Sequence, residues 1–590
     1  MNDFQVWAPA AKAVELVLDP GPNLAMPRAD ARRLALAEVL QGWWRVSAPH
    51  SPSRTDYAYV IDGGQLFPDP RSPWQPYGVH GPSRSISHLD FKWTDQKWQA
   101  PPLSSAIIYE LHVGTFTPEG TFEGAINRLE YLVRLGVTHV ELMPVAEFPG
   151  ERGWGYDGVD LFAPHHAYGG PEGLKRLVDA CHSHGLAVLL DVVYNHLGPD
   201  GNYLGSFGPY FTDRYQTPWG QAVNLDGPGS TEVRRFFCDN ARMWLRDYHF
   251  DGLRLDAIHA IFDSSAIHFL EQLAVKIEEL KSETGRHFDL IAENDLNDPR
   301  IVTSREAGGY GLDAQWNDDF HHALHTVLTG ERLGYYADFG KVADLAKALK
   351  HAYVYDGCMS SYRRRAHGRR ARNLPAHRFV GFLQNHDQVG NRAQGDRASQ
   401  LLSVRQLKTG AALVLCAPLL PMLFQGEEFG ASTPFLYFTD HSNRELAAAV
   451  SKGRREEFAS FGWQPDQVPD PQALSSFESS KLDWNQPDRD PHQELLRWYR
   501  ALTSLRRNTP ALSDGNLEHV HVEFNESDSW LVLYRESIAV VCNFSSRRVS
   551  IPGKFRGQML LASDADVTVH ENAAEVPGES VLTIESEVFL

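Results

Sequence analysis

The sequence predicts an α/β protein, a (β/α)8 TIM barrel with an N-terminal β-sandwich and a C-terminal β-sandwich domain. The chain has 590 residues, which is more than one ordinary domain needs. From Ser105 onwards, apolar strand-like stretches alternate with stretches of helical spacing, giving roughly eight β/α units over about 400 residues. These strands are apolar along almost their whole length, which is typical of a parallel sheet covered on both faces.

Residues 1–90 are predicted to form the N-terminal β-sandwich. The stretches FQVWAP, VELVLD, GWWRVSAP and TDYAYVIDGG are rich in β-forming residues, and Pro, Gly and Asp interrupt them at turns. Residues 91–104 are predicted to be a linker. The catalytic barrel is then expected at residues 105–510.

The barrel units follow one another in order. AIIYELHVGTF predicts the first strand, and AINRLEYLVRLG has helical spacing and ends at Gly136. In PEGLKRLVDACHSHG, Pro171 at the start and Gly185 past the end are the expected helix boundaries. The later strands are predicted, with helices between them, in VTHVELMPV, LAVLLDVVYNH, GLRLDA, HFDLIAEN, LDAQWN, FVGFLQNHD and PLLPMLFQGEE.

A final helix, PHQELLRWYRALTSLRRN, is expected to close the barrel domain. Residues 511–590 then become rich in strand-forming segments such as SWLVLYRES, IAVVCNFS and ESVLTI, which predict the C-terminal β-sandwich. The structural alternative to the barrel is a doubly wound open sheet. No G-x-G-x-x-G motif follows the first strand to support that alternative.

Composition argues against nucleic acid or an anionic membrane as the main partner. The formal net charge is -19, and the pI is about 5.7, whereas phosphate binding needs basic surfaces. The run RRRAHGRRAR, residues 363–372, is a local exception, interpreted as a solvated, mobile loop, with phosphate or RNA binding as the alternative. The five cysteines form no C-x-x-C pair and are expected to be mostly core thiols.

Location is predicted from what the sequence lacks. The start, MNDFQVWAPA, has neither a basic nor an apolar signal region, and no run approaches the length of a membrane span. We therefore expect a protein of the reducing cytoplasm, with no membrane contact and no obligate protein partner.

One predicted strand carries charges where apolar residues are expected. In DGLRLDAIHA, residues 251–260, Arg254 and Asp256 lie among leucines. Residues two apart on a strand point to the same side, so this strand directs a guanidinium and a carboxylate together into the protein. Burying a charge is costly unless it is paired or used.

Polar clusters end four of the predicted strands, and in such barrels the chemistry lies at these carboxyl ends. The clusters lie in DVVYNH, LRLDA, LIAEND and FLQNHD. Helix capping would explain one such cluster but not four. No phosphate-binding loop and no compact metal-ligand set is present. A pair of carboxylates acting as nucleophile and acid indicates glycoside hydrolysis, in which Arg254 would keep Asp256 ionised.

These four segments resemble, in order and spacing, the four motifs of the α-amylase superfamily. The resemblance implies that Asp256 is the nucleophile, Glu293 the general acid/base and Asp387 the stabiliser of the transition state. It also implies that His196, His386 and Arg254 bind substrate, that Tyr156 stacks on a sugar, and that Asp191 is largely structural. The N-terminal sandwich is similar to the carbohydrate-binding-like domain of branching and debranching members.

Longer stretches resemble a narrower family, the maltooligosyltrehalose trehalohydrolases. They are DGLRLDAIHAI, AENDLNDPR, WNDDFHHALHTVLTGERLGYYADFG and FLQNHDQVGNR. The resemblance implies cleavage of the α-1,4 bond next to the terminal trehalose unit of maltooligosyltrehalose, which releases trehalose and so contributes to trehalose biosynthesis. The alternatives are a glycogen branching enzyme, another amylase-type α-glucan hydrolase, and a catalytically silent glycan-binding protein.

Selection of trehalose on the leaving side needs further polar residues close to the motifs. The candidates by position are Asn294, Asp295, Asp318, Asp319, Gln388, Asn391 and Arg392, which we call the leaving-side set. The alternative is that most of them cap helices or pair with one another. The insertion after the third strand has no dense carboxylate set, so neither a metal nor a cofactor is expected.

Overall fold

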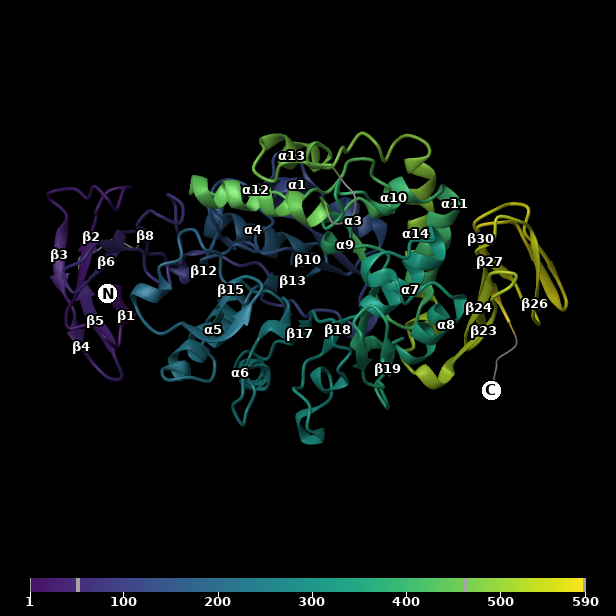
Figure 1. The fold of residues 1–590 in the computed structure, drawn as a ribbon, viewed down its shortest axis with the longest axis horizontal. Helices are drawn as coiled ribbons and strands as arrows, with labels where there is room; N and C mark the ends of the chain where they lie inside the picture. Colours follow the sequence, from purple (N-terminus) through teal and green to yellow (C-terminus); the bar gives the residue numbers. More distant parts are fainter. Residues whose placement is uncertain (1, 49–53, 460–463, 556, 587–590) are drawn as a thin grey trace.

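A closed barrel of eight parallel strands forms the middle of the protein, which was analysed as a computed structural model. The structure describes residues 2–48, 54–459, 464–555 and 557–586. Figure 1 shows the barrel between the N-terminal sheets at one end and the C-terminal sheets at the other. The barrel strands are β9 (Ile108–Leu111), β10 (His139–Leu142), β13 (Ala187–Val192), β16 (Gly252–Leu255), β17 (Asp289–Ala292), β18 (Ala314–Trp316), β21 (Phe379–Phe382) and β22 (Leu420–Phe424).

The register of the strands brings distant polar residues together. β13 pairs with β16 so that Asp191 lies opposite Arg254, and β16 pairs with β17 so that Arg254 lies opposite Ile291. Every residue of β13, β16 and β17 is buried. The apolar residues that predicted these strands therefore form the core, and Asp191 and Arg254 are buried within it.

The predicted helices surround the barrel and confirm the α/β alternation. α4 has Pro171 in its first turn, as expected. α3 ends at Gly136, whose φ of 92° a residue with a Cβ rarely adopts. The main helices are α3 (Leu129–Leu135), α4 (Gly170–Ser183), α5 (Ser230–Asp247), α6 (Phe269–Thr284), α7 (Asp318–Thr329), α8 (Val342–His351), α11 (Val404–Cys416) and α14 (His492–Asn508).

The N-terminal region forms two facing sheets. One has the strand order β1 (Asn2–Trp7), β5 (Trp43–Ala48), β4 (Ala37–Glu38), and the other has the order β3 (Arg32–Ala35), β2 (Val14–Leu18), β6 (Asp56–Ile61), β7 (Leu66–Phe67). It is tied to the barrel by the Trp43 indole, which donates to Glu232 of α5. Within the predicted linker, Trp98 stacks on His182. Its indole N–H donates to Asp251, which directly precedes β16. This segment therefore packs firmly against the barrel. The proposed boundaries at residues 90, 104 and 510 stay predictions.

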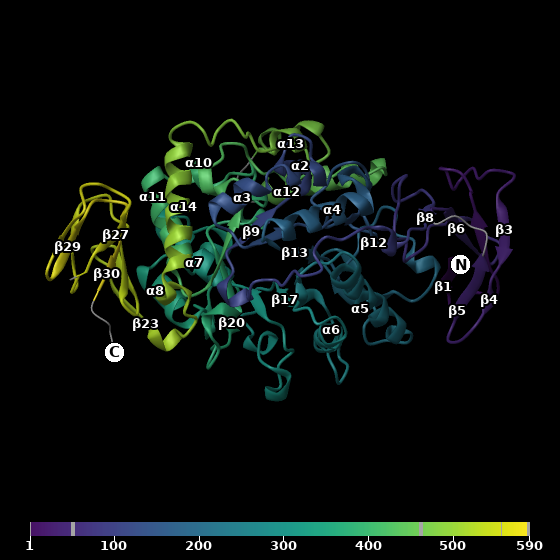
Figure 2. The same ribbon diagram turned by 180° about the vertical axis from the view of Figure 1, so that it is seen from behind.

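The C-terminal region also forms two sheets. One has the strand order β23 (Val520–Asn525), β24 (Trp530–Arg535), β25 (Ile538–Asn543), β30 (Ser580–Glu585), β27 (Met559–Ala562), and the other has the order β26 (Val549–Pro552), β29 (Ala573–Val576), β28 (Thr568–His570). Figure 2 shows α11 and α14 standing between these sheets and the barrel. Arg506 of α14 and Arg535 of β24 donate to carbonyls at the end of α11, including those of Leu415 and Cys416. The buried guanidiniums thus satisfy helix-end carbonyls at the domain junction.

Three two-stranded hairpins extend from the barrel loops. They are β11–β12 (Ala146–Glu147, Asp160–Pro164), β14–β15 (Phe211–Thr217, Gly220–Val223) and β19–β20 (Asp356–Ser360, Arg365–Gly368). The arginine run 363–372 was interpreted as a mobile loop, and that interpretation is wrong for residues 365–368, which form β20. Cross-strand pairing with β19 orders them, which the local charge pattern does not reveal.

No helix in the described part of the chain has the length and apolar character that crossing a membrane requires. Four of the five cysteines are buried, as expected for core thiols, and Cys358 on the β19–β20 hairpin is exposed.

Candidate functional site

Arg254 and Asp256 point to the same side of the end of β16, as the strand alternation predicts. The Arg254 Nη1 donates to Asp256 Oδ1 at 2.9 Å and to both carboxylate oxygens of Asp191, at 2.7 and 2.8 Å. Arg254 is fully buried and stacks 4.3 Å over the Trp316 ring. Three buried charges are thus held in one cluster, with two carboxylates around a single guanidinium.

Asn195 completes the surroundings of Asp256. Its side-chain Nδ2 donates to Asp256 Oδ2 at 2.7 Å and to the Asp256 carbonyl at 2.8 Å. The Asp256 carboxylate is therefore held at both oxygens, by an arginine and an amide. This arrangement keeps the side chain in one orientation, as nucleophilic attack requires.

Glu293 lies directly after β17 and contacts the same arginine. Its Oε2 is 3.4 Å from Arg254 Nη2 and accepts from the backbone N–H of Ala257. Ala257 adopts a left-handed φ of 38°, a strained conformation that aims this N–H at the carboxylate. The Glu293 side chain remains 18% exposed, so substrate can reach it.

Electrostatics favour the protonated form of Glu293 near neutral pH. Burial is the largest cause of a raised pKa at Glu293, which reaches about 8. The carboxylates of Asp256 and Asp387 raise this pKa further, and Arg254 partly opposes them. The site therefore contains a carboxyl group that can act as a general acid.

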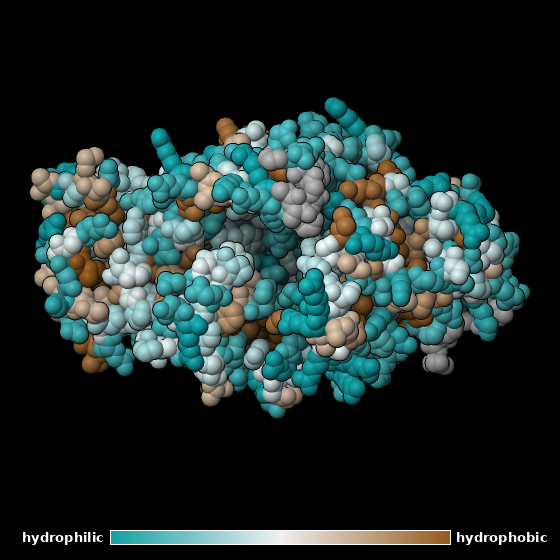
Figure 3. Space-filling view, in the orientation of Figure 1, coloured by the Kyte–Doolittle hydropathy of each residue, from teal (hydrophilic) through white to brown (hydrophobic). Residues whose placement is uncertain are grey.

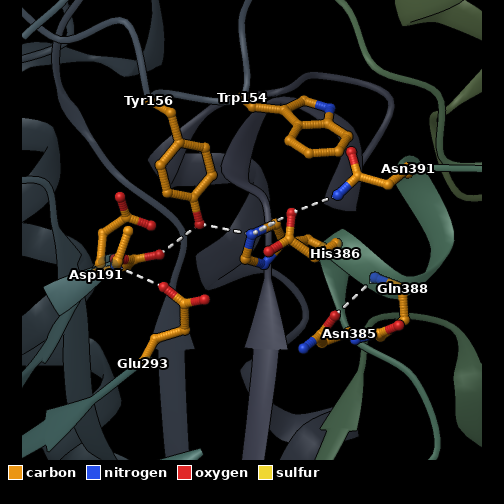
Figure 4. Close-up of polar contacts among 12 residues, drawn as sticks. Trp154, Tyr156, Asp191, Glu293, Asn385, His386, Gln388 and Asn391 are labelled. Atoms are coloured by element: carbon orange, nitrogen blue, oxygen red, sulfur yellow. Dashed lines mark hydrogen bonds and ion pairs between the residues drawn. The ribbon is translucent and has the colours of Figure 1, made fainter. Parts of the chain in front are cut away.

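Tyr156 joins Asp191 to His386, as Figure 4 shows. The Tyr156 hydroxyl lies 2.6 Å from Asp191 Oδ2 and 2.8 Å from His386 Nε2. On its other side, His386 Nδ1 is 2.5 Å from Glu110 Oε1. Burial would lower the pKa of His386, but Glu110 and Asp387 outweigh burial and raise the pKa to about 9. His386 is thus held as a cation at neutral pH.

Asp387 and His196 lie at the edges of this cluster. Asp387 is 39% exposed, and its Oδ1 accepts from Asn391 Nδ2 at 3.0 Å. His196 is buried, hydrogen-bonds Asn195 and the Tyr156 carbonyl, and stacks on the Trp219 ring at 4.4 Å. His196 therefore lies beside Asn195, which holds Asp256, and Asp387 lies beside His386.

We define the catalytic cluster as Tyr156, Asp191, Arg254, Asp256, Glu293 and His386. Figure 3 shows the surface hollowed near the middle of the molecule, on the face of the barrel seen in Figure 1. In Figure 4 the side chains of the cluster and of its neighbours converge from several barrel strands and loops.

Three members of the leaving-side set are bound within the protein. Asn294 donates to Gln315 at 2.8 Å, and Arg392 makes a two-pronged pair with Glu331. Asp319 Oδ2 accepts from the backbone N–H groups of Val354 and Tyr355, both at 2.7 Å, and from Asn297. Asn294, Asp319 and Arg392 are therefore held in place by other residues of the protein.

The remaining members are Asp295, Asp318, Gln388 and Asn391, of which Asn391 donates to Asp387. Asp295 pairs with Arg363 at 2.9 Å. Gln388 Oε1 is 3.4 Å from the Tyr336 hydroxyl. Within the described part of the chain, the Asp318 carboxylate accepts no hydrogen bond, and burial raises its pKa to about 7. Asp318 therefore offers an unengaged carboxyl group beside Glu293.

Some residues of the site were not predicted. Asn195 and Glu110 contact Asp256 and His386 directly, and Trp219 at the tip of the β14–β15 hairpin, 48% exposed, covers His196. Asn195 could have been found, because it precedes His196 in the motif DVVYNH. Glu110 could have been found as a charge within the apolar stretch AIIYELHVGTF, whereas Trp219 has no such signal, since only the hairpin brings it to the site.

Two groups of described residues could offer three metal ligands each, Glu147 with His165 and His166, and Asp514 with His519 and Glu536. Neither group includes a member of the catalytic cluster. The Glu147 carboxylate already accepts from the backbone and ring of His166. The expectation of no metal stays a prediction.

Comparison with known proteins identifies relatives over nearly the whole chain. A family model described as the alpha amylase catalytic domain matches residues 86–209, and a domain of unknown function, DUF3459, matches residues 515–583. A solved structure from Salmonella typhimurium, described provisionally as an alpha amylase, superposes with a TM-score of 0.89. It is 38% identical and covers 99% of this chain and 97% of its own.

Two curated relatives carry a narrower name, malto-oligosyltrehalose trehalohydrolase. The protein from Arthrobacter ramosus is 53% identical over 86% of this chain and 87% of its own length. The protein from Rhizobium sp. (strain M-11) is 47% identical over 97% of this chain and 96% of its own. The chain therefore belongs to the malto-oligosyltrehalose trehalohydrolase family of glycosidases, within the α-amylase superfamily.

Proposed function

We propose that this protein hydrolyses the α-1,4-glucosidic bond next to the terminal trehalose unit of maltooligosyltrehalose and releases trehalose with retention of configuration. The observation that carries the proposal is the arrangement around Arg254, which contacts both Asp256 and Glu293. A carboxylate held in place beside a carboxyl group with a raised pKa is the pairing that a retaining glycosidase needs. The name shared by relatives at 42–53% identity supports the substrate.

In the first step, the Asp256 carboxylate attacks C1 of the glucose on the non-reducing side of the bond. Glu293 donates its proton to the departing trehalose oxygen, which leaves as an alcohol. A covalent β-glucosyl ester forms on Asp256. In the second step, Glu293 takes a proton from water, the water attacks C1, and the ester breaks to release the maltooligosaccharide in the α configuration.

The residues around this pair hold the sugar and the charges. We assign Asp387 to the stabilisation of positive charge at C1, because it is an exposed carboxylate beside Glu293. We assign the cationic His386 and the Tyr156 hydroxyl, which contact each other, to the binding of hydroxyl groups of the bound glucose. Arg254 orients Asp256 and offsets the charge of the neighbouring carboxylates.

Recognition of trehalose is assigned to the part of the leaving-side set that has free polar atoms. Asp318 and Gln388 are the strongest of these, and Asp295 and Asn391 lie beside them. Asn294, Asp319 and Arg392 are proposed to act through the loops that they hold. A site that hydrogen-bonds the hydroxyls of trehalose rejects other sugars, because its polar groups would be left unpaired.

Product analysis tests the proposal. Purified protein is incubated with a maltooligosaccharide capped by trehalose and with a plain maltooligosaccharide of equal length, alongside Asp256→Asn. We expect rapid trehalose release from the capped substrate, slow cleavage of the plain one and none by the variant. Equal cleavage of both substrates would indicate a general α-glucan hydrolase, and α-1,6 branches formed on amylose would indicate a branching enzyme.

The cytoplasm is proposed as the site of action. All five cysteines lie among the described residues, and each is a free thiol. Free thiols, most of them buried, suit a reducing compartment.

A further inference from the structure

Two loop segments on the leaving side expose apolar side chains. The segment that follows α7 carries Leu333 and Tyr335, which are 73% and 38% exposed. The β19–β20 hairpin carries Met359 and Tyr362, which are 72% and 49% exposed. Exposed apolar groups that cluster beside a site often form a ligand-binding wall.

The first segment is fixed close to the catalytic residues. The Tyr336 ring stacks on His325 of α7 at 4.6 Å, and its hydroxyl is 3.4 Å from Gln388, which follows Asp387 in the sequence. Tyr335 stacks on His322 at 4.9 Å. The segment therefore lies along the side of α7 that faces α9 (His386–Gly390).

Asp338 joins this segment to the tip of the hairpin. Its Oδ2 accepts from the Tyr355 hydroxyl at 2.7 Å, from Ser360 Oγ at 2.5 Å and from the Tyr362 N–H at 3.2 Å. Its Oδ1 accepts from the backbone N–H and the hydroxyl of Ser361. One carboxylate thus receives five hydrogen bonds, one from Tyr355, which directly precedes β19, and four from the tip of the hairpin.

The same hairpin reaches back to the acid/base residue. Ser360 Oγ, which donates to Asp338, also accepts from the Arg363 N–H at 2.9 Å. The Arg363 guanidinium then pairs with Asp295, two residues after Glu293, at 2.9 Å. His367 of β20 is 2.7 Å from the Asp295 carbonyl. A continuous chain of contacts therefore runs from Asp338 to the segment that carries Glu293.

We propose that Asp338 is a positioning residue that holds the hairpin tip against the leaving side of the site and thereby sets the preference for a trehalose-ended substrate. The inference rests on the proposed function. Asp338 acts only through the hairpin: without its charge, the five donors lose their common acceptor and the tip moves away from the bound leaving group. The contribution of Asp338 is to binding on the leaving side and not to bond cleavage.

The test is the variant Asp338→Asn, which keeps the shape but replaces one acceptor oxygen with a donor group. We expect KM for the trehalose-capped substrate to rise about tenfold, since hydrogen bonds to a charged group are being lost, while kcat changes less than about threefold. KM for the plain maltooligosaccharide should change less than about threefold, so the selectivity ratio falls.

The matched control is Asp356→Asn on the same hairpin. Asp356 pairs with Lys347 and Arg370 and takes no part in the chain of contacts to Glu293. Asp356→Asn should leave unchanged the selectivity ratio, which is the KM for the plain substrate divided by the KM for the capped one. If Asp338→Asn does not fold, Ser361→Ala removes a donor from the exposed tip and should lower the ratio by a smaller factor.

The outcomes separate the two proposals. An equal loss on both substrates, or a fall in kcat alone, would overturn the positioning role of Asp338. If the wild-type protein does not distinguish the two substrates, the proposed function fails. The positioning role is then judged by hydrogen–deuterium exchange in residues 356–368, which must increase in Asp338→Asn and not in Asp356→Asn.

Discussion

The catalytic cluster and the leaving-side set lie at the same end of the barrel and have the same kinds of side chain, but they bind different partners. The cluster residues bind one another across β13, β16 and neighbouring loops, as Asp191 and Arg254 do. Members of the leaving-side set bind residues outside the cluster instead, as Asn294 does with Gln315 and Asp319 does with Val354 and Tyr355. The sheet sets the direction of a side chain at the end of a strand. The direction of a side chain a few positions later depends on the path of the loop that carries it.

The largest effect is expected at the centre of the cluster. Asp256→Asn should lower kcat by about 10⁴-fold, because it removes the carboxylate that we propose forms the glucosyl ester. The melting temperature should stay close to that of the wild type, since Asn still accepts from Arg254. Measurements of kcat and of the melting temperature on this variant check the two expectations. A wild-type kcat would show that Asp256 is not the nucleophile.

A smaller effect is expected one contact away from the reacting atoms. Tyr156→Phe removes the hydroxyl between Asp191 and His386 and should lower kcat/KM by about 10- to 100-fold, the value of a hydrogen bond to a charged group. Tyr336→Phe, whose hydroxyl makes a longer contact with Gln388, is the control and should lose less than about threefold. Equal losses of kcat/KM in Tyr156→Phe and Tyr336→Phe would contradict the distinction between the catalytic cluster and the leaving-side set.

Two adjacent carboxylates test the distinction within the leaving-side set. Asp319→Asn should lower the melting temperature by about 2 °C or more, because three donors lose a charged acceptor in a buried place. Asp318→Asn should leave the melting temperature unchanged, because its carboxylate holds no loop. Calorimetry measures the melting temperatures of both variants. A larger loss in Asp318→Asn than in Asp319→Asn would show that Asp318 is the structural member of the pair.

The smallest effect is a shift of the pH profile. Glu293 must be protonated to act as an acid, so kcat/KM should fall as the pH rises through about 8, its pKa in the folded protein. Asp318 is one of the carboxylates that raise this pKa, so Asp318→Asn should lower it and move the alkaline limb to lower pH. A limb that stays in place, or moves to higher pH, would contradict the assignment of Glu293.

The sequence determined the barrel and most of the catalytic cluster without any structure. Strand alternation placed Arg254 and Asp256 on one side, and the end of each apolar stretch marked where Asp191, Glu293 and His386 would meet. These predictions work because a parallel barrel brings the carboxyl ends of all its strands to one edge. The alternation of side chains along a strand then determines which of them point to the same side at that edge.

Only the tertiary structure decided what lies around that cluster. Glu110 reaches His386 because β9 and β22 pair and close the barrel. Residues 365–368 of the arginine run form a strand because β19 pairs with them. Asp338 gathers five donors from residues 17 to 24 positions further along the chain. Such contacts depend on how loops fold against each other, and loop paths are set by long-range packing that no short pattern of residues encodes.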